Sequence, residues 1–186
     1  FSPDARMKKL LGEAATLGAA TARAITYQPR IKGVYIYPDT DSAWTTAYAN
    51  KNTTFEANGA MGLDARVLFY YNATGVTQAM AATTVGQGSD YALAYLDADK
   101  KPLDGAKTYR LHLPPDVPVN NFWAVTLYDT QTRSLLQTGQ EFPTIGSQTQ
   151  GMTANADGSY DIYFGPKAPE GKDGNWLQTV PGKSWF

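Results

Sequence analysis

The sequence contains no cysteine, and this absence excludes several kinds of chemistry at once. Disulfide bonds, thiolate nucleophiles and cysteine-ligated zinc or iron–sulfur sites all require that side chain. Histidine occurs only once, as His112, so a metal site built from several histidines cannot form within this chain. Any Ser-His-Asp arrangement would have to use the same residue.

Long apolar runs and an excess of one charge are also missing. No segment approaches the roughly 18 consecutive apolar residues that a membrane helix requires, and the opening FSPDARMKKLL lacks the hydrophobic stretch of a signal peptide. With 16 Lys and Arg against 17 Asp and Glu, the chain has no overall positive field that would hold a polyanion. We therefore expect neither a membrane span nor a nucleic-acid partner.

The common cofactor and hydrolase motifs are absent as well. The sequence has no P-loop, no HExxH and no GxSxG motif, and GQGSDY at 86–91 lacks the third glycine of a dinucleotide-binding motif. Two acidic loops, 97–104 and 155–161, lack the closing glutamate of a calcium loop, so turn formation accounts for them better than metal binding. We predict no cofactor, no metal site and no catalytic residue.

The first segment that is clearly patterned predicts a helix over residues 3–26. Ser2 suits the capping position, and Pro3 suits the first helical position. Apolar residues recur at spacings of three and four from Met7 to Ile25 and form one stripe. We expect this stripe to pack against a sheet, another helix or a neighbouring module.

The next two segments are less regular. IKGVYIYPDTDS, at 31–42, suggests a short strand and a turn. Residues 62–75, GLDARVLFYYNATG, fit either a helix closed by Gly75 or a strand through RVLFYY. The Asp near the start and the Gly at the end favour the helix.

From residue 90 onward, the pattern indicates β-strands. Residues 90–97 and 107–114 alternate in polarity on either side of a turn-rich loop, which predicts a hairpin in which Arg110 and His112 share one face. Residues 120–129 carry apolar groups on both faces, as a central strand would. Further strands are expected in SLLQTG, SYDIYFG and NWLQTV. The fold predicted is α+β, mainly β: an antiparallel β-sandwich or jelly-roll-like domain preceded by an N-terminal helical segment.

The segment HLPPDVPVNN, at 112–121, joins two of these strands. Its three prolines fix the backbone and remove three N–H donors, so we expect a rigid, extended crossover that cannot lie inside a β-ladder. Such rigidity fits two interpretations: a simple strand connection, or a fixed row of polar side chains at Asp116, Asn120 and Asn121.

Two long runs, YRLHLPPDVPVNNFWAVTLYDTQTRSLLQT and NADGSYDIYFGPKAPEGKDGNWLQTVPGKSWF, resemble the bacterial family called domain of unknown function 1214. The resemblance implies a β-sandwich, a periplasmic or secreted location and no assigned reaction. Members commonly carry an upstream module, domain of unknown function 1254, and usually continue past the PGKSWF motif. We therefore expect residues 1–57 to form an N-terminal helix and linker between modules, and residues 58–186 to form the β-sandwich domain, truncated at its C-terminus.

The motifs that carry this resemblance also supply polar residues that could converge on one crevice. The predicted ligand-binding residues are His112, Asn120, Asn121, Arg133, Lys167, Asn175 and Lys183. Their cations and amides suit a small polar, anionic or carbohydrate-like ligand. We expect His112 to orient such a ligand as a hydrogen-bond donor.

Two functions remain open at this point. The first is a ligand-binding or assembly module of the bacterial envelope, which forms a homo-oligomer or binds the upstream module, with its exposed sheet edge covered by another copy or by its own tail. The alternative is a hydrolase or other small-molecule enzyme with its site in a cleft against the upstream module. An enzyme should show converging polar side chains with perturbed pKa values in a pocket, whereas an assembly module should show a large self-complementary surface.

Overall fold

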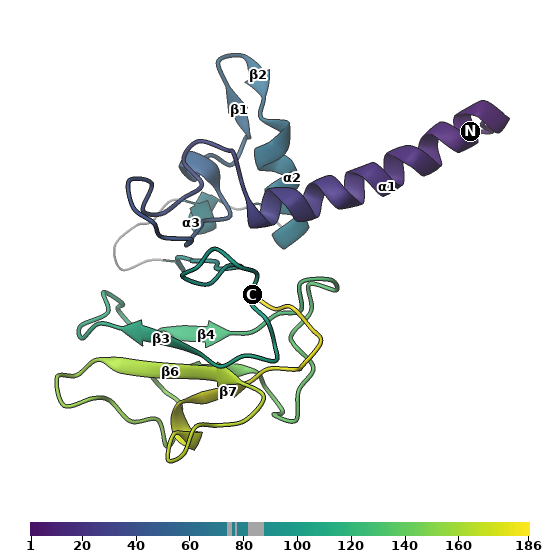
Figure 1. Cartoon of the computed structure of the whole chain (residues 1–186). Helices are drawn as coiled ribbons and strands as arrows, with labels where there is room; N and C mark the ends of the chain where they lie inside the picture. The colour runs from purple at the N-terminus through teal and green to yellow at the C-terminus, as the bar shows by residue number, and fades with distance from the viewer. Residues whose placement is uncertain (74–75, 77, 82–87) are drawn as a thin grey trace. The chain divides into compact units, whose positions relative to one another are not determined.

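The computed structural model describes residues 1–73, 76, 78–81 and 88–186 (Figure 1). The chain forms two compact units, residues 1–98 and residues 99–186. One long N-terminal helix and mostly short strands in small sheets confirm the mixture of helix and sheet. The closed sandwich or jelly roll stays a prediction, and the boundary expected after residue 57 falls inside the first unit.

The first unit begins with α1, which spans Ala5–Tyr27 and confirms the predicted helix. Its N-cap is Asp4, not Ser2 as expected, because the Asp4 carboxylate accepts a hydrogen bond of 2.7 Å from the backbone N–H of Met7. A carboxylate placed there also complements the positive end of the helix dipole. Within the described part of the chain, no helix is long and apolar enough to cross a membrane.

Only the last turns of α1 pack against the rest of the first unit. Ala22 and Thr26 are buried, and Ile25 packs against a small cluster that contains Val34. The large apolar side chains nearer the start of the helix are exposed: Met7, Leu10, Leu11 and Leu17. The predicted stripe therefore exists, but most of it is not covered by the described residues of this chain.

The rest of the first unit consists of short elements. They are η1 Ala49–Lys51, β1 Glu56–Ala57, β2 Ala60–Met61, α2 Leu63–Asn72 and α3 Gln78–Ala81. The helix interpretation of GLDARVLFYYNATG is confirmed, since α2 covers most of that segment. The helix is capped by Ala73, and the predicted closing residue Gly75 lies outside the described residues. The strand expected at 31–42 is reduced to a single bridge between Tyr35 and Thr45.

The hairpin predicted between residues 90–97 and 107–114 is wrong. Residues 90–97 belong to the first unit, where Leu93 bridges Thr45 and Tyr95 is buried with its hydroxyl bonded to Asn72. The second segment instead pairs with a strand about 50 residues further along the chain. Alternation identified the exposed and covered sides of residues 109–113 but could not identify the strand that pairs with them.

The second unit contains two small sheets. Its strands are β3 Tyr109–Leu113, β4 Ala124–Thr126, β5 Thr144–Gly146, β6 Tyr160–Gly165 and β7 Trp176–Gln178, with η2 Asp173–Asn175 before the last strand. One sheet has the order β3-β6-β7 and the other pairs β4 with β5. The β6–β7 pair is parallel, so the predicted purely antiparallel arrangement is wrong for this pair.

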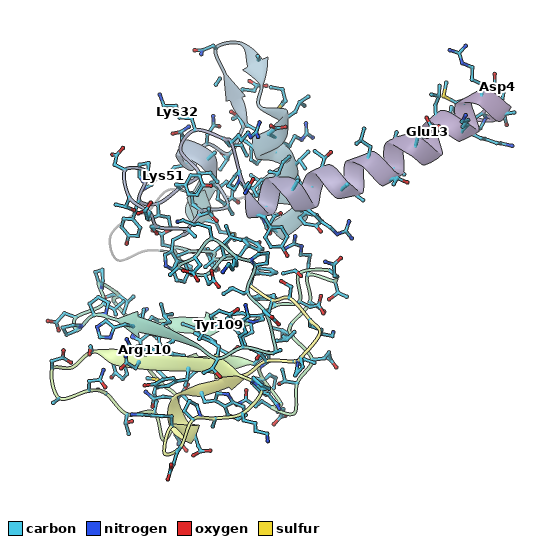
Figure 2. The ribbon with its side chains drawn as sticks, in the orientation of Figure 1. Asp4, Glu13, Lys32, Lys51, Tyr109 and Arg110 are labelled. Carbon is cyan, nitrogen blue, oxygen red and sulfur yellow. The ribbon has the colours of Figure 1, made fainter. Side chains whose placement is uncertain are left out.

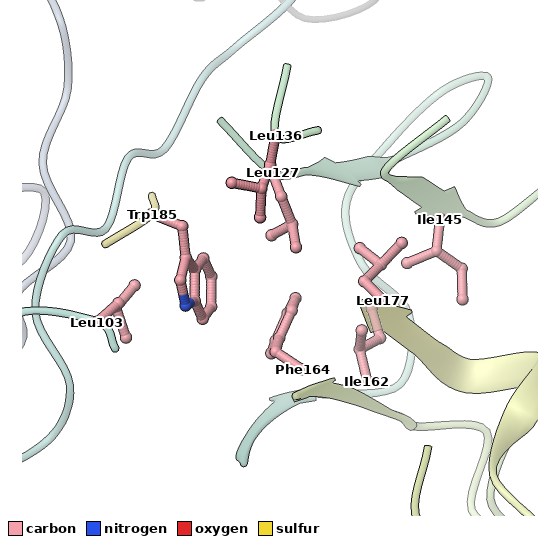
Figure 3. Packing of buried hydrophobic residues seen from close by; sticks show 8 residues of the cluster. All are labelled: Leu103, Leu127, Leu136, Ile145, Ile162, Phe164, Leu177 and Trp185. Atoms are coloured by element: carbon pink, nitrogen blue, oxygen red, sulfur yellow. The ribbon is translucent and has the colours of Figure 1, made fainter. Parts of the chain in front are cut away.

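One apolar cluster forms the core of the second unit (Figure 3). The three-stranded sheet contributes Ile162, Phe164 and Leu177, and Leu127, Leu136 and Ile145 come from β5 and the segments next to β4. Leu103 and Trp185 complete the cluster. Burying side chains of this size from both sheets is the main source of stability for this unit.

Residues 120–129 do not form the expected central strand. Only residues 124–126 are in a strand, and β4 has a single partner, β5, which the sequence pattern did not predict. Phe122 is exposed, whereas Trp123 packs against the core cluster, so only one face of the segment is covered. The strand expected at 134–139 is reduced to a bridge between Leu135 and Tyr128.

The proline-rich segment ends β3 at Leu113, as its missing N–H donors require. It is not extended throughout, because Asp116 has a φ of 57° and turns the chain there. At the C-terminus, the backbones of Tyr128 and Phe186 exchange two hydrogen bonds and their rings stack at 5.3 Å. The last residues of the chain thus pair with the segment that follows β4.

Candidate functional site

The candidate site lies on the outward face of the three-stranded sheet. Alternation along β3 directs Tyr109, Leu111 and Leu113 toward the core and leaves Arg110 and His112 on the opposite, exposed face. Figure 2 labels Arg110 on this strand. Paired residues of neighbouring strands point to the same side of a sheet. The residues of β6 that pair with Arg110 and His112, namely Tyr163 and Asp161, therefore lie on the same face.

The central feature of this face is a hydrogen bond between His112 and Asp161. These residues are direct cross-strand partners, and Nδ1 of His112 lies 2.8 Å from Oδ1 of Asp161. The histidine side chain is 52% exposed and the aspartate side chain 19%. An ionised carboxylate can only accept hydrogen bonds, so Nδ1 carries the proton and Nε2 is left for a ligand.

The ionised state of Asp161 follows from its surroundings. The hydrogen bond from His112 lowers the pKa of Asp161 below its ordinary value, against a smaller opposing effect of desolvation. The Arg110 guanidinium, 3.8 Å from Oδ2, and the side chain of Asn155 also favour the carboxylate. The imidazole is therefore held in one orientation by a partner that keeps its negative charge.

Aromatic side chains continue the same face across β6 and β7. Tyr163 pairs with Arg110 on one side and with Trp176 on the other, so all three point outward. Both rings are half-buried, and the Trp176 indole N–H donates to the carbonyl of Gly165. Nζ of Lys172, from the connection between β6 and β7, lies 5.9 Å from the centre of the Tyr163 ring. The face thus combines two rings, two cations and the histidine–aspartate pair.

The turn before β6 supports this arrangement. Asp157 accepts hydrogen bonds from the backbone N–H and the hydroxyl of Ser159, at 3.0 and 2.6 Å. The serine hydroxyl is the main cause of the lowered pKa of Asp157, and the charge of His112 makes a smaller contribution. Because Ser159 is only 1% exposed and donates to Asp157, its hydroxyl is committed to the turn.

Asn175, one of the predicted ligand residues, is buried and its amide is engaged within the protein. Its Oδ1 accepts from the backbone N–H of Thr153 at 2.9 Å, and its Nδ2 donates to the carbonyls of Thr153 and Asp161 at 2.8 and 3.0 Å. Asn175 and His112 are therefore brought together through Asp161. The buried amide thereby holds the backbone of Asp161.

Two other predicted residues, Arg133 and Lys183, contact Asp129 instead. Nζ of Lys183 lies 2.8 Å from Oδ2 of the buried Asp129, and the backbone N–H of Arg133 donates to the Asp129 carbonyl. The Arg133 guanidinium lies over the ring of Phe186 at 5.1 Å. These cations hold the C-terminal residues in place, and no hydrogen bond or ion pair in the described part of the chain joins them to His112.

The remaining predicted residues, Asn120, Asn121 and Lys167, are exposed on the second unit. Among the described residues, none of them forms a hydrogen bond or ion pair with His112. Sequence reasoning missed Asp161 as the partner of the histidine, and it missed Tyr163 and Lys172 as residues of the same face. The alternation of KTYRLHLP did place Arg110 beside it, but the partners of β3 depend on a pairing that no local pattern shows.

One groove of about 370 Å³ lies elsewhere on the second unit, along residues 135–141 and Pro143. None of the seven predicted ligand residues lines it. Within the described residues there is also no group of three or more His, Asp and Glu side chains placed to bind a metal. The outward face of β3-β6-β7 is therefore the best-defined candidate site.

Comparisons with known proteins agree with the motif resemblance. The sequence model of the family described as "Protein of unknown function (DUF1214)" matches residues 88–186. No curated protein matches the chain. A similar solved structure is that of the VPA0106 protein from Vibrio parahaemolyticus, with 21% identity and a TM-score of 0.42. The alignment covers all of this chain and 40% of that protein, so the chain spans less than half of its length.

Proposed function

Because the chain belongs to the DUF1214 family, whose description names no activity, we propose a function from the site itself: a ligand-binding module that holds a small polyhydroxyl ligand, such as a sugar. The ligand lies on the outward face of the β3-β6-β7 sheet. The observation that carries this proposal is the His112–Asp161 pair, which presents an oriented imidazole beside two half-buried aromatic rings.

The chemistry of the face suits a sugar. A sugar ring has an apolar face of C–H groups and a rim of hydroxyls, so it needs aromatic surface together with well-oriented donors and acceptors. Tyr163 and Trp176 supply the surface, and Arg110 supplies N–H donors at the edge. In the neutral ring of His112, Nε2 accepts a hydrogen bond from a ligand hydroxyl, while a protonated ring donates one instead.

The proposal extends to the setting of the module. We place it in the bacterial periplasm or outside the cell, as the family resemblance implies, and in contact with another copy of itself or an upstream module. Two small sheets that pack around one apolar cluster support our proposal that the second unit is a small β-sandwich. Gel filtration would test whether the protein binds another copy of itself. Localisation of the protein in cells would test whether it lies in the periplasm or outside the cell.

A second candidate is an enzyme that uses the His112–Asp161 pair as a general base. The 2.8 Å hydrogen bond between the ring and the carboxylate is the arrangement that orients catalytic histidines. The nearby Ser159 hydroxyl donates to Asp157, so it is not available as a nucleophile. The nucleophile would therefore be a water molecule or a group of the substrate. Conversion of a bound ligand into a product, followed over hours, would favour this candidate.

Titration followed by ¹⁵N-edited NMR would test binding at this face. We expect a panel of monosaccharides and disaccharides to shift the amide signals of β3, β6 and β7 and the indole signal of Trp176. His112→Ala should abolish these shifts, because it removes the oriented imidazole. Lys101→Ala, at an exposed position in the same unit, is the matched control and should leave them unchanged. Shifts confined to other parts of the chain, or none with any sugar, would rule out the proposed site.

A further inference from the structure

Tyr163 lies between two cationic side chains. Arg110 is its direct partner across the β3–β6 pair, and Nζ of Lys172 lies 5.9 Å from the centre of its ring. The two cations come from different elements, one from a strand and the other from the connection that leads to β7. An aromatic ring with two cationic neighbours is the most distinctive charge arrangement on this face.

The nearby carboxylate does not occupy these cations fully. Asp161 lies 3.8 Å from the Arg110 guanidinium, which is longer than a hydrogen bond, and its shorter contact is with His112 at 2.8 Å. The Arg110 side chain is 61% exposed, so its planar group of N–H donors is accessible from solvent. Among the described residues, the ion pair with Asp161 is the one formed by Arg110, and Lys172 forms none, so both cations can attract a ligand anion.

Ligand carboxylates match this arrangement better than neutral hydroxyls do. A guanidinium binds a carboxylate through two parallel hydrogen bonds, and an ammonium group adds a point charge that depends little on direction. A sugar that stacks on Tyr163 would bring a substituent at its edge within reach of one or both cations. A neutral sugar would use the same ring contact and can accept a hydrogen bond from Arg110, but it lacks the attraction between opposite charges.

We propose that the ligand of this face carries a carboxylate, as in a uronic acid, and that Arg110 and Lys172 select it through that group. The inference rests on the proposed function, because it specifies the chemistry of a ligand bound at the same face. Arg110 provides the two-point contact and Lys172 the longer-range attraction. Tyr163 supports the ring between them.

Glucose and glucuronate form a matched pair of probes, since they differ only in the oxidation state of carbon 6. Isothermal titration with the full chain should show glucuronate binding about tenfold more tightly than glucose, the ratio expected for one charge-assisted contact. Added NaCl should weaken glucuronate binding and leave glucose binding unchanged, because only the first depends on charge. Equal affinity for the two sugars would overturn the inference.

Variants separate the roles of the two cations. Arg110→Gln and Lys172→Gln should each lower the affinity for glucuronate much more than that for glucose, because glucose loses at most a neutral hydrogen bond, while Arg110→Lys should restore only part of the loss. Lys101→Gln is the control for a change of net charge and should affect neither sugar. Equal losses for both sugars would overturn selection by charge. If neither sugar binds the unchanged chain, the proposed function itself fails and this inference fails with it.

Discussion

Residues 1–98 and residues 99–186 differ in how they bury apolar side chains. The second unit gathers eight buried residues in one cluster between its two sheets. The first unit divides its buried side chains between two smaller clusters, one around Phe69 and one around Val34. Most of the large apolar side chains that are exposed in the described residues also lie in the first unit, and several of them are on α1.

This difference shows where a rigid site can be built. A single core that receives side chains from both sheets fixes β3 and β6 from behind, so the outward residues of these strands are held in place. In the first unit, α1 is fixed only near its end by Ala22 and Thr26. We therefore expect substitutions in the second unit to have the larger effects on stability, and four experiments test that expectation in order of decreasing effect.

Leu136→Ala should produce the largest loss of stability. Leu136 is 1% exposed and belongs to the core cluster, so truncation should leave a cavity and lower the free energy of unfolding by about 3 kcal/mol. Urea unfolding followed by tryptophan fluorescence would measure the loss. A Trp44→Phe background removes the one tryptophan of the first unit, so the signal then reports the second unit alone.

The control for this prediction is Leu17→Ala. Leu17 is 69% exposed on α1, and the same truncation there removes no buried contact within the chain. With Trp44 kept, so that the fluorescence also reports the first unit, its free energy of unfolding should change by less than about 0.5 kcal/mol, as is usual for exposed positions. Equal losses for the two variants would remove the proposed difference between the units.

Asn175→Ala should have the next largest effect. The buried amide makes three hydrogen bonds to the backbone of Thr153 and Asp161, and the loss of these bonds should cost about 2 kcal/mol. Sugar binding should also weaken, because the strand residue that orients His112 loses its support. Asn120→Ala, at an exposed loop position, is the control and should preserve both stability and binding. If Asn175→Ala unfolded with the same free energy as the unchanged chain, the hydrogen bonds of this amide would not stabilise the fold as described.

Asp129→Asn should have a smaller effect that depends on pH. Burial by itself raises the pKa of Asp129, but the hydrogen bond from Lys183 and the backbone N–H groups of Gln131 and Thr132 outweigh it and lower the pKa below 3.8. The folded form is therefore stabilised above the ordinary carboxyl pKa, and this stabilisation is lost as the pH falls through the lower, folded-state value. At neutral pH the variant should lose about 1–2 kcal/mol.

Acid titration of stability is the measurement for Asp129. The unchanged chain should lose stability below about pH 4, and the variant should lose less over the same range because it no longer takes up that proton. Part of the slope should persist, since the pKa values of Asp157 and Asp161 are lowered as well. Identical slopes for the two proteins would show that Asp129 does not contribute to the acid sensitivity.

Local patterns in the sequence predicted several parts of this structure. The spacing of apolar residues located α1, and the alternation in KTYRLHLP placed Arg110 and His112 on the exposed face of β3. Both are properties of a single segment, determined by the geometry of one helix or one strand. The helix at residues 63–72 was also predicted, and the acidic residue near its start, Asp64, lies in its first turn.

Strand pairing could not be predicted in the same way. β3 pairs with β6 across about 50 residues, and β6 pairs in parallel with β7, which no alternation pattern specifies. Asp161 was therefore missed as the partner of His112, although NADGSYD had been noted as an acidic loop. The predicted ligand residues do not lie together: Asn175 contacts Asp161, whereas Lys183 contacts Asp129. The sequence could not show this separation, because it depends on contacts between distant segments.

Leu10→Asp should have the smallest effect and gives the sharpest test of α1. Leu10 is 47% exposed, so a carboxylate there would remain hydrated, and only the lower helix propensity of Asp, about 0.5 kcal/mol, would be lost. If the stripe is instead covered in solution, the same charge would be buried without a partner and the loss would reach several kcal/mol. Urea unfolding at two protein concentrations distinguishes these outcomes, because a stripe covered by another copy would make the stability of the unchanged chain rise with concentration. A large loss at both concentrations would mean that α1 is buried within its own chain, which would contradict the difference between the two units.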